Sequence, residues 1–215
     1  MVERIGFQVM TDLQGYFKEG QRKLIYNSAD SFRDKVLIRL LWITGRRISE
    51  ILNIKVHEID FNLKAISIHV LKKTRTVKDE LGNRERVKFD KVSLSYIDIL
   101  TTGLLQRYVL ETGLQPGDYL FKSAFKKDGH ISRQRAYQII SRVCRIAGID
   151  KVGKHKPHPH HFRHSYAVDV AKKMKAPEDV RKLQLALDHS TLAVTEQYLK
   201  FGAKEMRSII ENIGD

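Results

Sequence analysis

Residues 158–167 read HPHHFRHSYA, and residues 187–199 read LDHSTLAVTEQYL. Far upstream, residues 44–52 read TGRRISEIL. Together these three stretches supply arginines, histidines and a tyrosine, the side chains that a protein needs to break a phosphodiester covalently without a metal ion.

The chemistry of a phosphodiester explains why these residue types matter together. A tyrosine is a poor nucleophile while it is protonated, because its reference pKa is about 10, so it needs a base or a positive field beside it. Histidines and arginines supply both. In the transition state negative charge spreads over the non-bridging oxygens, and the fixed fork of donors on arginine suits that target better than the point charge of lysine.

In this order, the three stretches resemble the successive signature motifs of the tyrosine recombinases, the phage-integrase family that includes the Xer-type recombinases. One motif alone is weak evidence, but all three with this spacing are specific. The resemblance runs from about residue 7 to the C-terminus. We therefore expect residues 1–215 to form a tyrosine recombinase catalytic domain without the N-terminal core-binding domain, either as a minimal natural protein or as the catalytic part of a longer one.

The first motif contributes an arginine and a carboxylate. Arg47, rather than Arg46, falls on the arginine of the family pattern TGxRxSE. The resemblance implies that Arg47 and Arg163 clamp the scissile phosphate and that Glu50 supports the site from behind. The alternative is that each arginine is a surface residue paired with a nearby carboxylate, which for Arg47 would be Glu50.

The later motifs contribute the remaining groups. The resemblance implies that His160 is the base or a hydrogen-bond partner of the reacting groups, that His189 hydrogen-bonds the phosphate and that Tyr198 is the nucleophile. Asp188 stands where the family usually has glycine, which is a departure at the turn before His189. Taken alone, Tyr198 has the helical spacing of an ordinary core tyrosine, and only the motif singles it out.

The family's lysine lies on a hairpin of the sheet and protonates the departing 5′ oxygen. Lys72 is the best match because it follows an alternating apolar segment, although the adjacent Lys73 fits the pattern with a shift of one residue. Either lysine could instead be a solvated phosphate contact. We expect Lys73, Arg75 and Arg46 to contact DNA.

The crowded histidines raise the alternative of a metal site. His160, His161 and His164 could present imidazoles at helical spacing, but no carboxylate or cysteine nearby completes a recognisable set of zinc ligands. We therefore expect neither a metal ion nor another cofactor.

Composition points to a polyanionic partner. The formal net charge is +14, from 39 Lys and Arg against 25 Asp and Glu, and such an excess favours double-stranded DNA. On charge alone, a basic protein with no nucleic-acid role would fit as well. The single cysteine, Cys144, rules out an intrachain disulfide and fits a buried thiol. The absence of a long apolar run and of a signal peptide predicts a cytoplasmic protein.

Hydrophobic periodicity predicts an α+β fold that is mainly helical, as the resemblance also implies. We expect strands near 59–61, 66–70 and 87–92 to form a small three-stranded antiparallel sheet, with a basic loop over 72–86. Helices are expected over about 7–18, 30–44, 95–111, 132–147, 160–174, 177–187 and 192–199, with a short one beginning at residue 47 and a last amphipathic segment over 206–213.

The resemblance implies a site-specific recombinase or integrase that forms a 3′-phosphotyrosyl DNA link through Tyr198 and needs neither ATP nor Mg²⁺. It also implies a homotetramer on DNA, assembled through the C-terminal segment, although docking of that segment on its own domain is equally compatible with its apolar face. A type IB topoisomerase shares this chemistry, and a DNA-binding module without catalysis is a rival of another class. The first two motifs and the complete set of catalytic residues favour the recombinase.

Overall fold

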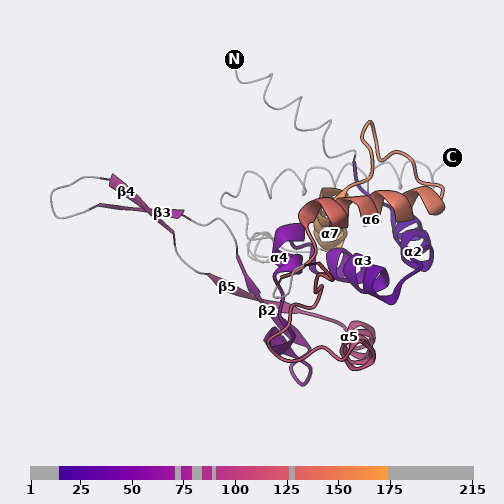
Figure 1. The fold of residues 1–215 in the computed structure, drawn as a ribbon. Helices are drawn as coiled ribbons and strands as arrows, with labels where there is room; N and C mark the ends of the chain where they lie inside the picture. Colours follow the sequence, from indigo (N-terminus) through magenta and orange to yellow (C-terminus); the bar gives the residue numbers. More distant parts are fainter. Residues whose placement is uncertain (1–14, 71–73, 79–83, 89–90, 126–128, 174–215) are drawn as a thin grey trace, which may run out of the picture. The chain divides into compact units, whose positions relative to one another are not determined.

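The structure is a computed structural model that describes residues 15–70, 74–78, 84–88, 91–125 and 129–173 (Figure 1). These residues fall into two compact units. The helical unit contains the described residues up to Arg47 and those from Tyr137 onward, and the sheet unit contains those of Ile48–Ala136. Each unit is described by itself.

The centre of the helical unit is helix α3 (Phe32–Thr44), which packs against α2 (Glu19–Asn27) and α7 (Pro159–Lys173). Its side chains Val36 to Ile38, Leu40 and Leu41 are fully buried. The Ser31 hydroxyl accepts a hydrogen bond from the Asp34 N–H at 3.1 Å, so the helix is capped one residue later than the expected start at residue 30. It ends at Gly45, as the sequence predicts.

Helix α2 was not predicted, and the described part of the helix expected over 7–18, residues 15–18, is not helical. The polar composition of α2 hides its buried face, which is formed by Arg22 and Ile25. Arg22 is 1% exposed and pairs with Asp169 of α7 at 2.5 Å, with its guanidinium carbon 5.3 Å from the centre of the Trp42 ring. An ion pair and a cation–π contact therefore hold α2 against its neighbours. This helix was missed at the sequence level because the expected signal was a periodic pattern of apolar residues.

Helix α6 (Arg133–Ile146) begins where the Ser132 hydroxyl accepts the Arg135 N–H at 3.0 Å, which confirms the predicted cap. Further along α6, the guanidinium group of Arg142 forms ion pairs with two carboxylates. One belongs to Asp30 and the other to Asp34, a buried residue of α3. Cys144 is fully buried, and burial raises the pKa of its thiol to about 12, so the prediction of a core thiol is confirmed.

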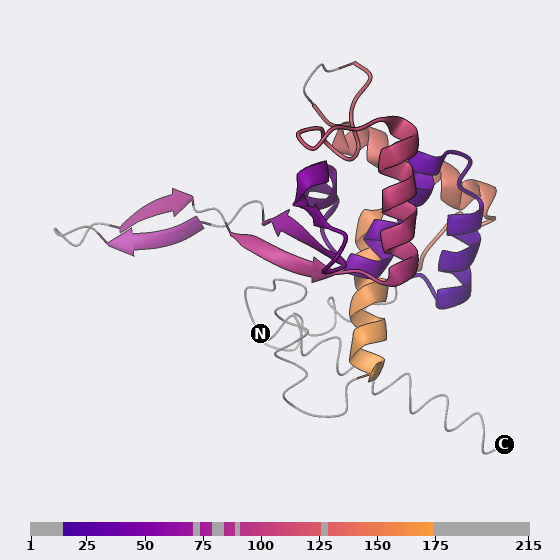
Figure 2. The ribbon, with the colours of Figure 1, turned by 90° about the horizontal axis from the view of Figure 1, so that it is seen from below.

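The sheet unit contains a three-stranded antiparallel sheet in the order β1 (Ile59–Asp60), β2 (Ala65–His69), β5 (Val92–Tyr96). Its third strand is not the segment expected over 87–92. Strands β3 (Thr74–Lys78) and β4 (Arg84–Lys88) pair instead with each other and form the ribbon visible in Figure 2. Strand β3 lies within the basic loop expected over 72–86, and β4 begins in that loop and ends in the expected strand. The threonines and valines in these strands favour extended backbone, and the many charges concealed that signal.

The described part of the sheet unit also contains α4 (Ile48–Leu52), the 3₁₀ turn η1 (Val56–Glu58) and α5 (Ile99–Thr112). Helix α5 is capped by Asp98, whose carboxylate accepts the Thr101 N–H at 2.8 Å. The mainly helical α+β fold with a small three-stranded antiparallel sheet is thus confirmed. The helices expected over 177–187, 192–199 and 206–213 lie outside the described residues. Within the described ranges, no helix is both long and apolar enough to cross a bilayer.

Candidate active site

The first motif is positioned by the end of α3. Gly45 caps this helix with a left-handed backbone, φ 60°, and its N–H donates to the Leu41 carbonyl at 3.3 Å. An alanine at this position would place its Cβ only 2.5 Å from Cδ1 of Tyr166 on α7. Glycine is therefore required twice, for the backbone conformation and for the close approach of the aromatic ring.

Arg163 joins the second motif to the first. Its side chain is 6% exposed, and its Nη1 donates to the Gly45 carbonyl oxygen at 2.9 Å. The two residues are 118 positions apart in sequence. The fold therefore brings the TGRR segment beside the helix that carries the HHFRH motif, although each was recognised only by its own pattern.

The neighbours of Gly45 differ in exposure. Arg47 is half-buried directly before α4, close to the expected helix start, and Glu50 on that helix is 1% exposed. Arg46 is 2% exposed, and its positive charge opposes the effect of burial, which raises the pKa of Tyr166. A side chain so deeply buried is not the surface group that a DNA contact usually needs, and the role of Arg46 at DNA stays a prediction.

Histidines surround the start of α7. His160, the expected base, is exposed, and its backbone N–H donates to Nδ1 of His158 at 3.2 Å. The backbone N–H of His158 in turn donates to Nδ1 of His161 at 3.2 Å. The rings of His158 and His161 stack with centroids 3.8 Å apart and an angle of 27° between their planes.

Burial controls the protonation of these rings. His161 is 2% exposed, and burial, followed by the repulsion of His158 and three other histidines, lowers its pKa to about 3. Burial also lowers the pKa of His158, and repulsion from His160 and His155 lowers it further. Both rings are therefore neutral at pH 7, so that each Nδ1 is available as an acceptor.

Sequence analysis missed this arrangement of His158 and His161. It treated His161 as a possible zinc ligand and gave His158 no role. Pro159 was the available signal, because proline favours the first position of a helix and makes the residue before it the cap. Among the described residues, no three potential ligands from His, Cys, Asp and Glu come together to hold a metal ion.

Several predicted site residues lie outside the described part of the chain. These are Lys72, Lys73, His189 and Tyr198. Arg75 lies on β3, where its Cα is paired with that of Val87 on β4. The roles of all five in catalysis or DNA binding stay predictions.

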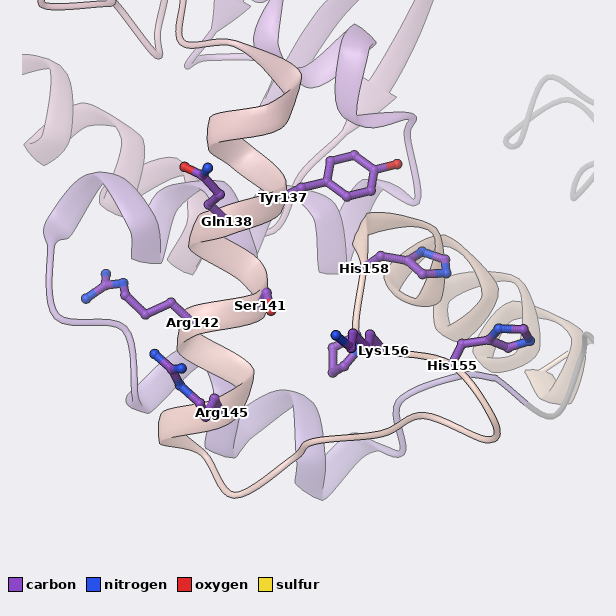
Figure 3. Close-up of a pocket in the computed structure, with 9 residues that line it drawn as sticks. Tyr137, Gln138, Ser141, Arg142, Arg145, His155, Lys156 and His158 are labelled. Atoms are coloured by element: carbon purple, nitrogen blue, oxygen red, sulfur yellow. The ribbon is translucent and has the colours of Figure 1, made fainter.

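A pocket of about 590 Å³ lies between α6 and the segment that leads into α7 (Figure 3). His158 is one of the residues that line it, and the labelled His158 ring points away from α6. Two of the lining cations, Arg145 and Lys156, make the pocket basic, whereas Arg142 is held by Asp30 and Asp34. The remaining lining residues are Tyr137, Gln138, Ser141, His155 and Pro157.

Comparison with known proteins agrees with this geometry. The Phage integrase family matches residues 16–205. The chain is 30% identical to the tyrosine recombinase XerC of Staphylococcus epidermidis in an alignment of 209 residues, which covers 93% of this chain and 62% of the relative. It is 29% identical to the tyrosine recombinase XerA of Pyrococcus horikoshii over 197 residues, covering 90% of this chain and 59% of the relative.

Solved structures show the same fold. A crystal structure of XerA recombinase superimposes with a TM-score of 0.69 at 22% identity, covering 90% of this chain and 62% of that chain. A pre-cleavage complex of XerH site-specific recombinase with its difH substrate gives a TM-score of 0.65 at 23% identity, covering 91% of this chain and 53% of that chain. This chain thus spans about three-fifths of the length of the curated relatives, 62% of the XerC protein. With a family match over nearly all its length and the two arginine motifs joined through Gly45 and Arg163, the chain belongs to the phage integrase family, among the Xer-like tyrosine recombinases.

Proposed function

We propose that this chain is the catalytic domain of a site-specific DNA recombinase that cleaves and rejoins strands through Tyr198. The observation that carries the proposal is the hydrogen bond from Arg163 to the Gly45 carbonyl, because it brings two arginine-bearing motifs into one place. A pair of guanidinium groups is suited to the spread charge of a phosphodiester in its transition state.

The reaction is a transesterification in which every bond is accounted for. The phenolic oxygen of Tyr198 bonds to phosphorus and the bond to the 5′ oxygen breaks, leaving a 3′-phosphotyrosyl link. Lys72 donates a proton to the departing oxygen, while His160 accepts or orients the phenolic proton. A 5′ hydroxyl from a partner strand then attacks the phosphotyrosyl link and releases the tyrosine. Since the ester is conserved, the exchange consumes no ATP.

The remaining assignments follow the same scheme. Arg47, Arg163 and His189 stabilise the pentacoordinate phosphorus, and Glu50 supports the site from α4. Removing one such preorganised donor commonly lowers a rate by about 100-fold to 1000-fold. The partner is double-stranded DNA, which suits the net charge of +14. Four copies assemble on two duplexes through the segment over 206–213.

The decisive experiment is trapping of the covalent adduct on a nicked duplex that carries the target site, with the modified residue mapped by mass spectrometry. Tyr198→Phe abolishes the adduct while DNA binding persists. Tyr96→Phe is the matched control, since Tyr96 is a 73% exposed tyrosine outside the motifs, and it leaves adduct formation unchanged. An undiminished adduct in Tyr198→Phe would refute the nucleophile.

The same substrates separate a recombinase from a topoisomerase. Both enzymes can relax supercoiled plasmid, but only a recombinase forms joint molecules from two duplexes. EDTA leaves the adduct yield unchanged if the mechanism needs no metal. Inhibition by EDTA that zinc reverses would instead favour the histidine metal site.

A further inference from the structure

The residue before helix α7 and the first three residues of the helix form an unusual arrangement. His158 precedes Pro159, the first residue of the helix, and therefore occupies the capping position. Nδ1 of His158 accepts the N–H of His160, while Nδ1 of His161 accepts the N–H of His158. In an ordinary capping box, Ser or Thr at the cap and Glu or Gln three residues later exchange hydrogen bonds in this reciprocal way.

We propose that His158 and His161 form a capping box made of two imidazoles, which positions His160 and Arg163 for DNA cleavage. The inference rests on the proposed function for its catalytic consequence, but the box itself is a property of the helix. His158 and His161 are positioning residues, because they act through the backbone of His160 and through the placement of α7.

The box is fixed within the helical unit on several sides. The ring of Phe17 meets the edge of the His161 ring, with centroids 5.7 Å apart. The Ser165 hydroxyl donates to the His161 carbonyl at 2.7 Å and accepts the Phe17 N–H at 2.8 Å. The stacked His158 ring covers another side of His161. A shift of the box would therefore disturb its contacts with the Phe17 ring and with the Ser165 hydroxyl, so the start of α7 has one preferred position.

The segment from His160 to Arg163, which carries two proposed catalytic residues, is held at both ends. The backbone of His160 is fixed by His158, and three residues further along, Arg163 is fixed by the Gly45 carbonyl. Residues three apart share one face of a helix. The box and the Gly45 contact together set the direction in which His160 and Arg163 approach a phosphate.

The box requires one protonation state. An Nδ1 accepts a hydrogen bond only while it lacks a proton, so both rings must be neutral and carry their proton on Nε2. A cationic ring would lose the acceptor, and two cationic rings stacked with centroids 3.8 Å apart would repel each other.

The surroundings favour the neutral state. His161 faces His158 and the nearby His155, His160 and His164, while Phe17 covers it with an apolar ring. Each of these four histidines becomes positive on protonation and would then oppose a charge on His161. His158 also lines the pocket. The other ionisable groups that line it are Tyr137, Arg142 and Arg145 on α6, and His155 and Lys156 in the segment before α7. Burial lowers the pKa of both rings, which keeps the box intact at neutral pH.

The first test reads the tautomers directly in the unmodified protein. Long-range ¹H–¹⁵N correlation spectra at pH 7.5 are expected to show His158 and His161 as neutral rings protonated on Nε2. Assignment comes from the loss of one signal in His158→Asn and of the other in His161→Gln. A proton on Nδ1 of either ring would overturn the proposal, whatever the activity of the protein.

The second test measures the rate of adduct formation at saturating nicked DNA. His158→Ala and His161→Ala are expected to lower this rate about tenfold to hundredfold, the size of effect that small misplacement of catalytic groups produces, with little change in DNA affinity. His158→Asn and His161→Gln restore most of the rate, because amide oxygens can cap the helix in the same two positions. His155→Ala, in the same stretch but outside the box, is the control and keeps the wild-type rate.

The outcomes separate this inference from the proposed function. If the wild-type protein forms no adduct, the proposed function fails, and the tautomers alone decide whether the box exists. If the wild-type protein forms the adduct and both alanine variants match its rate, the positioning role is overturned. Should the alanine variants not fold, the folded His158→Asn and His161→Gln proteins decide: retained cleavage supports the box, and loss of cleavage in both overturns it.

Discussion

At the scale of single residues, Gly45 has the most consequences in the site. Its φ of 60° and its contact with Tyr166 both exclude a side chain, and its carbonyl holds Arg163. The motif TG was recognised as a family signature, but its physical reason appears only in the packed structure. No pattern in the sequence shows that an aromatic ring from residue 166 lies against residue 45.

Gly45→Ala is therefore expected to destabilise the protein by about 2–4 kcal/mol, from the left-handed backbone and from the displaced ring of Tyr166. Gly148→Ala is the matched control, because Gly148 has a φ of 71° in the same unit and nothing within 4 Å of an added Cβ. It should cost only the backbone strain, about 1–2 kcal/mol. Urea denaturation measures both changes. Equal losses would show that contact with Tyr166 contributes nothing.

At the scale of secondary structure, elements with explicit end signals were the predictable ones. Helix α3 stops at Gly45, and α6 starts at Ser132, where the sequence places a stop and a cap. The strand expected over 87–92 was wrong because β4 of the ribbon ends in that stretch and β5 of the three-stranded sheet begins at its last residue. Alternation alone does not select the partner of a strand. The imidazole box was missed because histidine is not an expected cap, and only the fold shows that its Nδ1 atoms accept hydrogen bonds.

The start of α7 also predicts how stability responds to acid. His161 has a pKa of about 3 in the folded protein, whereas a histidine in an unfolded chain has its ordinary pKa of 6.5. Between these values the unfolded state binds more protons, so the free energy of unfolding falls as pH falls, by up to about 1.4 kcal/mol per unit. His161→Gln should remove this contribution, as urea denaturation at pH 7 and pH 5 would reveal. An identical pH dependence in both proteins would contradict the neutral, buried ring.

At the scale of the whole molecule, the proposed function assigns the general attraction for DNA to the positive charge and the chemistry to the motifs. Sequence alone gave the family, the fold class and the residues of the three motifs. The contact between two of these motifs required the folded chain, since it depends on how α3 and α7 pack. Charge and site therefore make separable predictions, one about binding in salt and the other about cleavage.

The net charge of +14 predicts DNA binding that weakens steeply with salt. Each neutralised phosphate contributes about 0.9 to the slope of log affinity against log salt, so a footprint of roughly 6–10 contacts loses about 10³-fold to 10⁵-fold between 50 and 200 mM. Arg75→Gln, at a predicted DNA contact on β3, should lower the slope by about one. Lys23→Gln is the control, because Lys23 on α2 is paired with Glu19 at 2.8 Å and is expected to leave the slope unchanged. Fluorescence anisotropy across a salt series measures all three proteins. A flat salt dependence in the wild-type protein would mean that its excess charge does not face the duplex, and the polyanionic partner would then have to be sought elsewhere.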